Sequence, residues 1–209
     1  AFSKLMPVDR SLVSYVFSGG RTQGIEVSNT GDQVRFFLNF TDGLAQQNAD
    51  WSADDTDYAF TGRIEYMAAG DNWGQFLDAV SFPGTEDHLM FGGAATYQVG
   101  EYGGATDIET ETFRWTIDGT YKSDGWNVFA MFLGNHVDTQ TANTDEYAFV
   151  VQGGVFVNED VQVFGRWEWA DPDTLAAEEL SILTLGFSKF WHGHGLKWTT
   201  DAGFGINSV

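Results

Sequence analysis

Apolar and polar residues alternate most regularly in two neighbouring segments between Asp145 and Trp169. Because successive side chains of a strand point to opposite faces, a period of two indicates two strands. The residues between them, Asn158-Glu159-Asp160, are typical of a turn and indicate a hairpin. One face carries Tyr147, Phe149, Val151, Val155, Val157, Val161, Val163, Trp167 and Trp169, and the opposite face carries Ala148, Gln152, Gly154, Gln162, Arg166 and Glu168.

Such a hairpin fits two environments. In a water-soluble sandwich the apolar face would lie in a core and would not normally carry several Trp near strand ends. In a transmembrane barrel the apolar face meets lipid and the polar face lines the interior. The longest apolar run, from Val128 to Leu133, is far shorter than the roughly 18 residues of a membrane helix. A closed barrel is the other structure that satisfies every backbone group in lipid. The pattern therefore favours a transmembrane β-barrel, with a soluble extracellular β-sandwich binding module as the alternative.

The same alternation recurs along the chain and predicts about ten strands in one antiparallel up-and-down sheet. Residues 1–21 show no sustained period and are expected to form a loop or a partial strand. Trp73, Phe76, Leu77 and Val80 have helical spacing, which predicts one short amphipathic helix over residues 73–82. The predicted strands cover residues 22–30, 34–41, 57–68, 88–97, 110–121, 126–137, 145–157, 161–170, 179–191 and 195–206.

The links between these strands alternate in length, as in outer-membrane barrels. Short links are expected at residues 31–32, 122–125, 158–160 and 192–194, and long links at 42–56, 98–109, 138–144 and 171–178. Acids gather in the long links, at Asp42, Asp50, Asp54, Asp55, Glu101, Asp107, Asp138, Asp171 and Asp173. An acidic rim of this kind would bind divalent cations shared with lipopolysaccharide, and the alternative is a set of solvated loop charges.

Composition and missing motifs limit the classes of function that the chain can have. The length of 209 residues predicts a single β-barrel domain over residues 1–209, and a net charge of -20 argues against nucleic-acid binding. Cysteine is absent, so neither a disulfide nor a thiolate metal site is expected. The motifs GxSxG, HExxH, GxGxxG and the P-loop are missing, and His192 and His194 are predicted to lie in a turn. We therefore expect no enzyme, no cofactor and no metal site.

The polar face of the predicted sheet carries charges of both signs. Same-face spacings of two or four residues allow these charges to pair within a strand or across neighbouring strands. A dry core would not accept so many charges, so this face is predicted to line a hydrated lumen that filters small solutes. The alternative is the exposed side of an open sheet. The residues predicted to line the pore are Arg35, Arg63, Glu65, Arg114, Asp118, Arg166, Glu168, Lys197 and Asp201.

Several short motifs resemble the phosphate-selective porin O and P family. They are the runs from Val8 to Val13 and from Gly19 to Gly24, the strand end from Phe40 to Gly43, and the segment from Trp73 to Gly84. The resemblance implies an outer-membrane porin that is a homotrimer of sixteen-stranded subunits and that passes anions or small solutes by diffusion. Its partners would be the lipid bilayer, lipopolysaccharide and small ions.

The match to that family is partial. Arg35, Arg63, Arg114 and Arg166 correspond loosely to its arginine ladder, but its lysine cluster has no counterpart, so a general porin that prefers anions is expected. Ten strands and an end without a terminal aromatic residue predict an incomplete barrel, with a self-contained ten-stranded barrel as the alternative. A structural, non-conducting barrel has the same pattern.

Overall fold

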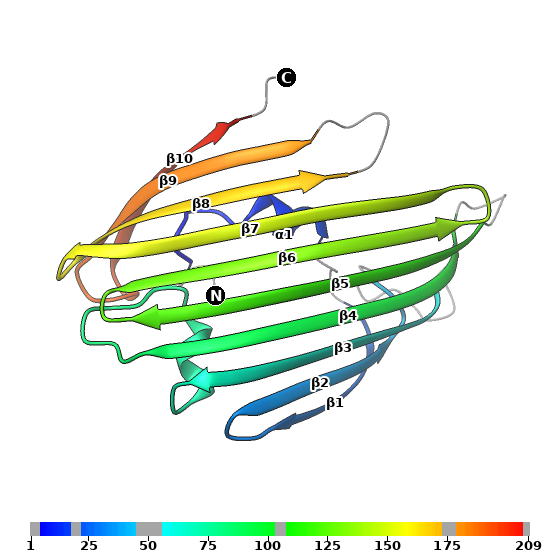
Figure 1. The fold of residues 1–209 in the computed structure, drawn as a ribbon, viewed down its shortest axis with the longest axis horizontal. Coiled ribbons are helices and arrows are strands. Elements are labelled where there is room, and N and C mark those ends of the chain that lie inside the picture. The colour runs from blue at the N-terminus through cyan, green and yellow to red at the C-terminus, as the bar shows by residue number, and fades with distance from the viewer. Residues whose placement is uncertain (1–4, 18–21, 45–55, 103–107, 173–178, 207–209) are drawn as a thin grey trace.

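The computed structural model describes residues 5–17, 22–44, 56–102, 108–172 and 179–206. Ten strands form one antiparallel sheet in which each strand pairs with the next along the chain (Figure 1). The all-β class and the up-and-down order are therefore confirmed. The strands are β1 (Gly24–Thr30), β2 (Val34–Thr41), β3 (Thr56–Ala69), β4 (His88–Tyr102), β5 (Ile108–Ser123), β6 (Trp126–Thr139), β7 (Asn143–Asn158), β8 (Val161–Asp171), β9 (Leu180–Phe190) and β10 (Lys197–Gly205).

The central strands are longer than the sequence predicts. Pairing continues to Tyr102 opposite Ile108 and to Asp138 opposite Asn143, because backbone hydrogen bonds do not require apolar side chains. Only residues 103–107 and 140–142 then remain as links between these strands. The prediction of long links over residues 98–109 and 138–144 is therefore wrong. The short link predicted over residues 122–125 consists of Asp124 and Gly125 alone, because Ser123 already pairs with Trp126. Gly125 adopts a positive φ of 74°, which glycine tolerates without strain.

Two helical elements accompany the sheet. The predicted helix over residues 73–82 is present only as the 3-10 helix η3 (Trp73–Leu77), which lies in an insert of residues 70–87 between β3 and β4. A second helix, α1 (Leu12–Phe17), lies where we expected a loop or a partial strand. Ser11 begins α1, with its hydroxyl oxygen accepting a hydrogen bond from the Ser14 N–H at 2.8 Å. In the described parts of the chain, no helix is long and apolar enough to cross a membrane.

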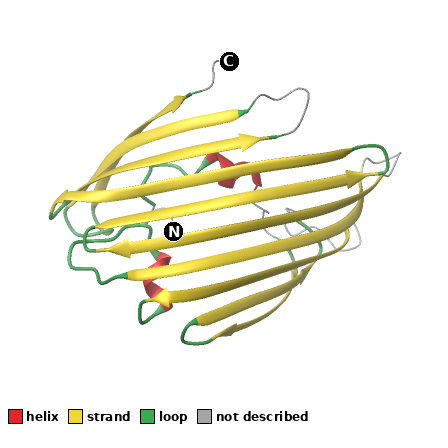
Figure 2. Cartoon of the chain, in the orientation of Figure 1, coloured by secondary structure: helices red, strands yellow, loops and turns green. Residues whose placement is uncertain are grey.

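The contacts of Leu5 show how strongly the sheet is curved. Its backbone oxygen accepts a hydrogen bond from Lys197 of β10 at 2.7 Å, and Leu5 also lines the same cavity as Arg35 of β2. In a flat sheet, the eight spacings from β2 to β10 would separate these strands by about 38 Å. The sheet therefore curves around the N-terminal segment, residues 5–17, which lies with the insert on the concave side (Figures 1 and 2).

Two apolar clusters attach these segments to the concave face. In the first, Val13 and Phe17 of α1 pack against small and aliphatic residues of β6, β7 and β8. In the second, Met6 and Val80 pack with Phe164 and Phe190. The core of the described protein is therefore the space between the concave face and the two segments that cover it.

The two edges of the sheet, β1 and β10, each pair on one side only. All seven residues of β1 are exposed. The sheet is consequently not closed, and the barrel that the sequence predicts is present only as a curved open sheet.

Candidate functional site

All nine residues predicted to line a pore belong to the concave face, but the structure separates them into two groups. Arg35, Arg63, Glu65 and Asp118 contact one another and are called the charged cluster below. The other five contact the N-terminal segment or residues beside it, and are called the anchoring residues. The anchoring residues are Arg114, Arg166, Glu168, Lys197 and Asp201.

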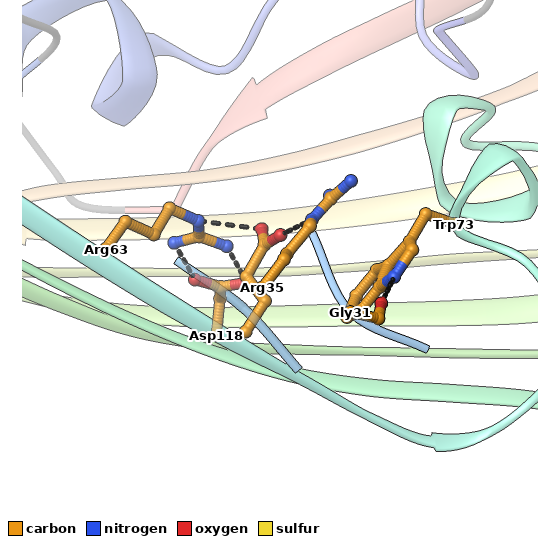
Figure 3. A network of polar contacts seen from close by, with 6 residues as sticks. Gly31, Arg35, Arg63, Trp73 and Asp118 are labelled. Atoms are coloured by element: carbon orange, nitrogen blue, oxygen red, sulfur yellow. Dashed lines mark hydrogen bonds and ion pairs between the residues drawn. The ribbon is translucent and has the colours of Figure 1, made fainter. Parts of the chain in front are cut away.

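The charged cluster joins β2, β3 and β5 and passes over β4, which lies between β3 and β5 (Figure 3). Arg63 of β3 donates two hydrogen bonds to the carboxylate of Asp118 on β5, at 2.7 and 2.9 Å, and a third to Glu65 at 2.8 Å. Arg35 of β2 pairs with the other oxygen of Glu65 through Nε. Both carboxylate side chains are almost fully buried, with 6% of Glu65 and 7% of Asp118 exposed. Two guanidinium groups and two carboxylates thus neutralise one another across the sheet.

Gly92 of β4 makes this arrangement possible. It pairs with Glu65 on one side and with Asp118 on the other, so it lies directly beneath the Arg63 side chain. A Cβ at Gly92 would meet Nη2 of Arg63 at 2.4 Å and Oδ1 of Asp118 at 2.8 Å. Arg63 can cross β4 to reach β5 only because residue 92 has no side chain.

A partly open cavity of about 410 Å³ lies beside the charged cluster. The cluster forms one wall, and the insert contributes Phe76, Leu77 and Ala79 to another. Trp73 of η3 packs over the Arg35 guanidinium, with 4.4 Å between the guanidinium carbon and the ring centre, and donates a hydrogen bond to the Gly31 oxygen at 2.8 Å. The insert therefore covers this end of the concave face and fixes the position of Arg35.

The anchoring residues hold the backbone of the N-terminal segment. Lys197 donates to the Leu5 oxygen at 2.7 Å, and the carboxylate of Asp201 accepts from the Val8 N–H at 2.6 Å. Arg114 donates to the Phe17 oxygen at 2.6 Å. The segment thus crosses the concave face from β10 to β5, and charged side chains meet its polar backbone along the way.

Arg166 and Glu168 form the most buried ion pair of the described residues, at 2.8 Å. Only 8% of the Arg166 side chain and 1% of the Glu168 side chain are exposed. Arg166 also donates to the Asp9 oxygen at 3.0 Å, and Glu168 accepts from the Val13 N–H at 3.3 Å. This pair therefore joins β8 to Asp9 and to the first turn of α1.

Of the same-face pairings that the spacing allows within a strand, the structure forms two. Glu65 pairs with Arg63, and Glu168 with Arg166. Asp118 pairs with Arg63 rather than with Arg114, four residues earlier on its own strand. Lys197 and Asp201 bind backbone groups of the N-terminal segment. The alternation of apolar and polar residues could not predict these contacts, because residues 1–21 show no period.

Polar contacts also hold the insert. Lys122 of β5 donates to the backbone oxygens of Gln75 and Asp78, both at 2.8 Å. His194, in the link between β9 and β10, lies 2.7 Å from the Asp78 carboxylate. Burial of this carboxyl acts to raise its pKa, but hydrogen bonds from His194 and from the Val80 N–H, with positive charge nearby, lower the pKa of Asp78 below its usual value.

The predicted acidic rim is only partly described. Asp50, Asp54, Asp55, Asp107 and Asp173 lie outside the described residues. Asp42 is fully buried and accepts hydrogen bonds from the Thr22 hydroxyl and from the Gln23 N–H. It therefore holds the two residues that precede β1 and is not a solvated rim charge. Among the described residues, no group of three or more His, Asp or Glu side chains is placed to hold a metal ion.

Comparisons of the chain with protein-family models, curated proteins and solved structures find no match. The resemblance to the phosphate-selective porin family therefore stays a prediction.

Glu168→Gln tests the buried ion pair. The substitution leaves the Arg166 charge buried without its partner, so we expect the free energy of unfolding to fall by about 3 to 5 kcal/mol. Urea unfolding in detergent micelles measures the change. Glu159→Gln, which removes the same charge from an exposed turn between β7 and β8, is the matched control. Equal stability of the two variants would contradict the assigned role.

Asp78→Asn tests how the insert is held. Because the pKa of Asp78 is lowered in the folded protein, its stabilising effect is present above the unfolded value of about 3.9 and is lost as pH falls through the folded value. We expect the substitution to reduce the free energy of unfolding by about 1 kcal/mol at neutral pH, with the difference from the original protein disappearing in acid. Glu86→Gln, at an exposed position of the insert, is the control, and a difference that persists unchanged in acid rules out this account.

Proposed function

We propose that the chain forms a β-barrel of the bacterial outer membrane and provides a passive diffusion path for ions and small hydrophilic solutes. The observation that carries this proposal is the convex face of the sheet. Large apolar side chains stand exposed there on every strand, and no second layer of the described residues covers them. Monomeric soluble proteins rarely expose apolar patches larger than a few hundred Å². An acyl-chain environment explains a face of this size and chemistry.

Aromatic residues on the convex face gather toward both ends of the strands. Tyr66, Trp126, Trp191 and Trp198 are exposed at the end where β3 meets the insert and where β5 and β9 turn. Tyr97, Tyr147 and Trp167 are exposed toward the opposite end. Aliphatic residues and Phe occupy the middle, as in Leu38, Ile64, Ile117 and Val151. Aromatic girdles around an apolar band are typical of membrane barrels.

The height of the band also supports the proposal. From Tyr147 to Val157, the convex residues of β7 are apolar or Gly, and ten residue steps cover about 33 Å along a strand. A tilt of about 40° reduces this length to about 25 Å, the height of the apolar band of outer-membrane barrels. Beyond Tyr97 the convex face becomes acidic, with Glu111 accepting a hydrogen bond from the Tyr97 hydroxyl at 2.7 Å. Such a change suits a strand that emerges from lipid into water.

Closure of the sheet belongs to the proposal. Unpaired strand edges are not stable in hydrocarbon, because their backbone groups find no hydrogen-bond partner there. In an up-and-down sheet of ten strands, β1 and β10 run in opposite directions, so they can pair with each other directly. Further strands between them would instead give the sixteen-stranded subunit of a homotrimer that the family resemblance implies. In both arrangements the concave face becomes the interior, and lipid and lipopolysaccharide surround the exterior.

A non-conducting barrel is the second candidate, and a specific observation favours it. The N-terminal segment and the insert cover much of the concave face, and the anchoring residues hold the segment by its backbone. Solutes would pass only beside these segments or after they move. Whether the interior conducts solutes or is blocked therefore depends on the contacts that hold these two segments.

Single-channel recording tests the proposed function directly. The protein, refolded in detergent and inserted into planar lipid bilayers, is expected to produce discrete steps of ionic current. Circular dichroism of the same sample checks that the strands are formed. Folded, inserted protein that never conducts would rule out the diffusion channel and leave the structural barrel.

Deletion of residues 1–17 separates the two candidates further. Removing the segment uncovers the concave face at α1, so we expect a larger single-channel conductance than in the full chain. The matched control is Tyr15→Ser within the exposed side of α1, which keeps the segment in place. If the deleted protein folds and inserts but its conductance equals that of the full chain, the segment does not restrict the path.

A further inference from the structure

The cavity beside the charged cluster has the features of a specific ligand site. We propose that it binds a small organic monoanion with an apolar body, whose carboxylate contacts Arg35. This inference goes beyond passive diffusion, because it assigns saturable binding to one position on the concave face. It does not depend on conduction, since binding can be measured on folded protein in detergent.

Arg35 is the member of the cluster with the most hydrogen-bond donors left, because a guanidinium has five N–H donors and Arg35 uses one of them. Arg63 uses Nε, Nη1 and Nη2, and both oxygens of Glu65 and of Asp118 accept from guanidinium groups. Arg35 pairs through Nε alone, and no acceptor among the described residues bonds its Nη1 or Nη2. Figure 3 shows these terminal nitrogens projecting away from Arg63 and Asp118. Nitrogens of this kind donate and never accept, so the fitting partner is an anionic or carbonyl oxygen.

The position of Arg35 is fixed before a ligand arrives. Nε is paired with Glu65, and Trp73 packs over the guanidinium with its own N–H bonded to Gly31. Only 18% of the Arg35 side chain is exposed, so competition from water is limited. A fixed and partly buried donor loses little conformational entropy when it binds a carboxylate.

The rest of the cavity indicates the body of the ligand. Besides the cluster, the cavity wall carries the apolar side chains of Leu5, Phe76, Leu77, Met90 and Phe129 and the polar side chains of Asp78, Thr120, Asn127 and Gln152. Cavities of about 300 to 1,000 Å³ hold small organic molecules, and this one measures about 410 Å³. A short aliphatic chain or a single ring fits this volume and wall, whereas a fully hydrated inorganic anion would leave the apolar wall without contacts.

Charge limits the ligand to one negative group. In the cluster, Arg35 and Arg63 balance Glu65 and Asp118 by count. The carboxylate of Asp78 also lines the cavity, and the chain carries a net charge of -20. Di- and polyanions would meet strong repulsion from this field. A monoanion needs only the local donors of Arg35.

Calorimetric titration of the refolded protein in detergent tests the proposal with three probes. Hexanoate supplies the chain and the charge, hexanamide the chain alone, and inorganic phosphate the charge alone. We expect hexanoate to bind saturably with one site, and hexanamide and phosphate to bind at least about ten-fold more weakly. Titration into empty micelles corrects for partition of the probes.

Variants then place the site. Arg35→Gln is expected to weaken hexanoate binding about ten-fold or more, while Lys189→Gln, which removes the same charge from an ion pair with Asp160 at the β7–β8 turn, should leave it unchanged. Thr120→Leu fills the cavity without altering a charge and should also weaken binding. Equal binding of hexanoate and hexanamide, phosphate binding as tight as hexanoate, or equal effects of Arg35→Gln and Lys189→Gln would each overturn the proposal.

Discussion

Ten strands that alternate apolar and polar side chains form a stable sheet only if the two faces meet different surroundings. Here the polar face is concave and covered from within by the N-terminal segment and the insert, while the apolar face is convex and exposed. In water, that convex face would lose the hydrophobic stabilisation that normally drives folding. Surrounded by acyl chains, the convex face carries no such penalty. The curvature of the sheet and the girdles of aromatic residues fit the same environment.

Charge neutralisation organises the other face. The carboxylates of Glu65, Asp118 and Glu168 are almost fully buried, which is tolerable because each is paired with a guanidinium. The remaining charged residues do not pair with one another but satisfy the backbone of the N-terminal segment. Residues that alternation alone assigns to a hydrated lumen therefore serve largely as internal supports. Between the charged cluster and the insert, a cavity with charged and apolar lining remains open beside Arg35.

Alternation along the chain was sufficient to predict all ten strands and their order, because a period of two persists wherever one face is apolar and the other polar. It could not place the ends of β4 to β7, where polar residues such as Asp138 and Asn143 continue the pairing. It also missed α1, since six residues are too few for a helical period to stand out. For the site, it found which charges share a face but not which of them meet. Arg63 reaches Asp118 because Gly92 lies between them. The alternation of apolar and polar residues does not show which glycine of a neighbouring strand will lie beneath a given side chain.

The central claim is that hydrocarbon surrounds the convex face. Nitroxide labels at Leu38 and Val151 on that face and at Thr120 on the concave face, read by electron paramagnetic resonance in lipid vesicles, test it most directly. The account predicts that the convex labels collide readily with oxygen and hardly at all with a water-soluble nickel chelate. The label at Thr120 should not show this preference for oxygen over the nickel chelate. Convex labels that collide with the nickel chelate as freely as a label in water would contradict the account.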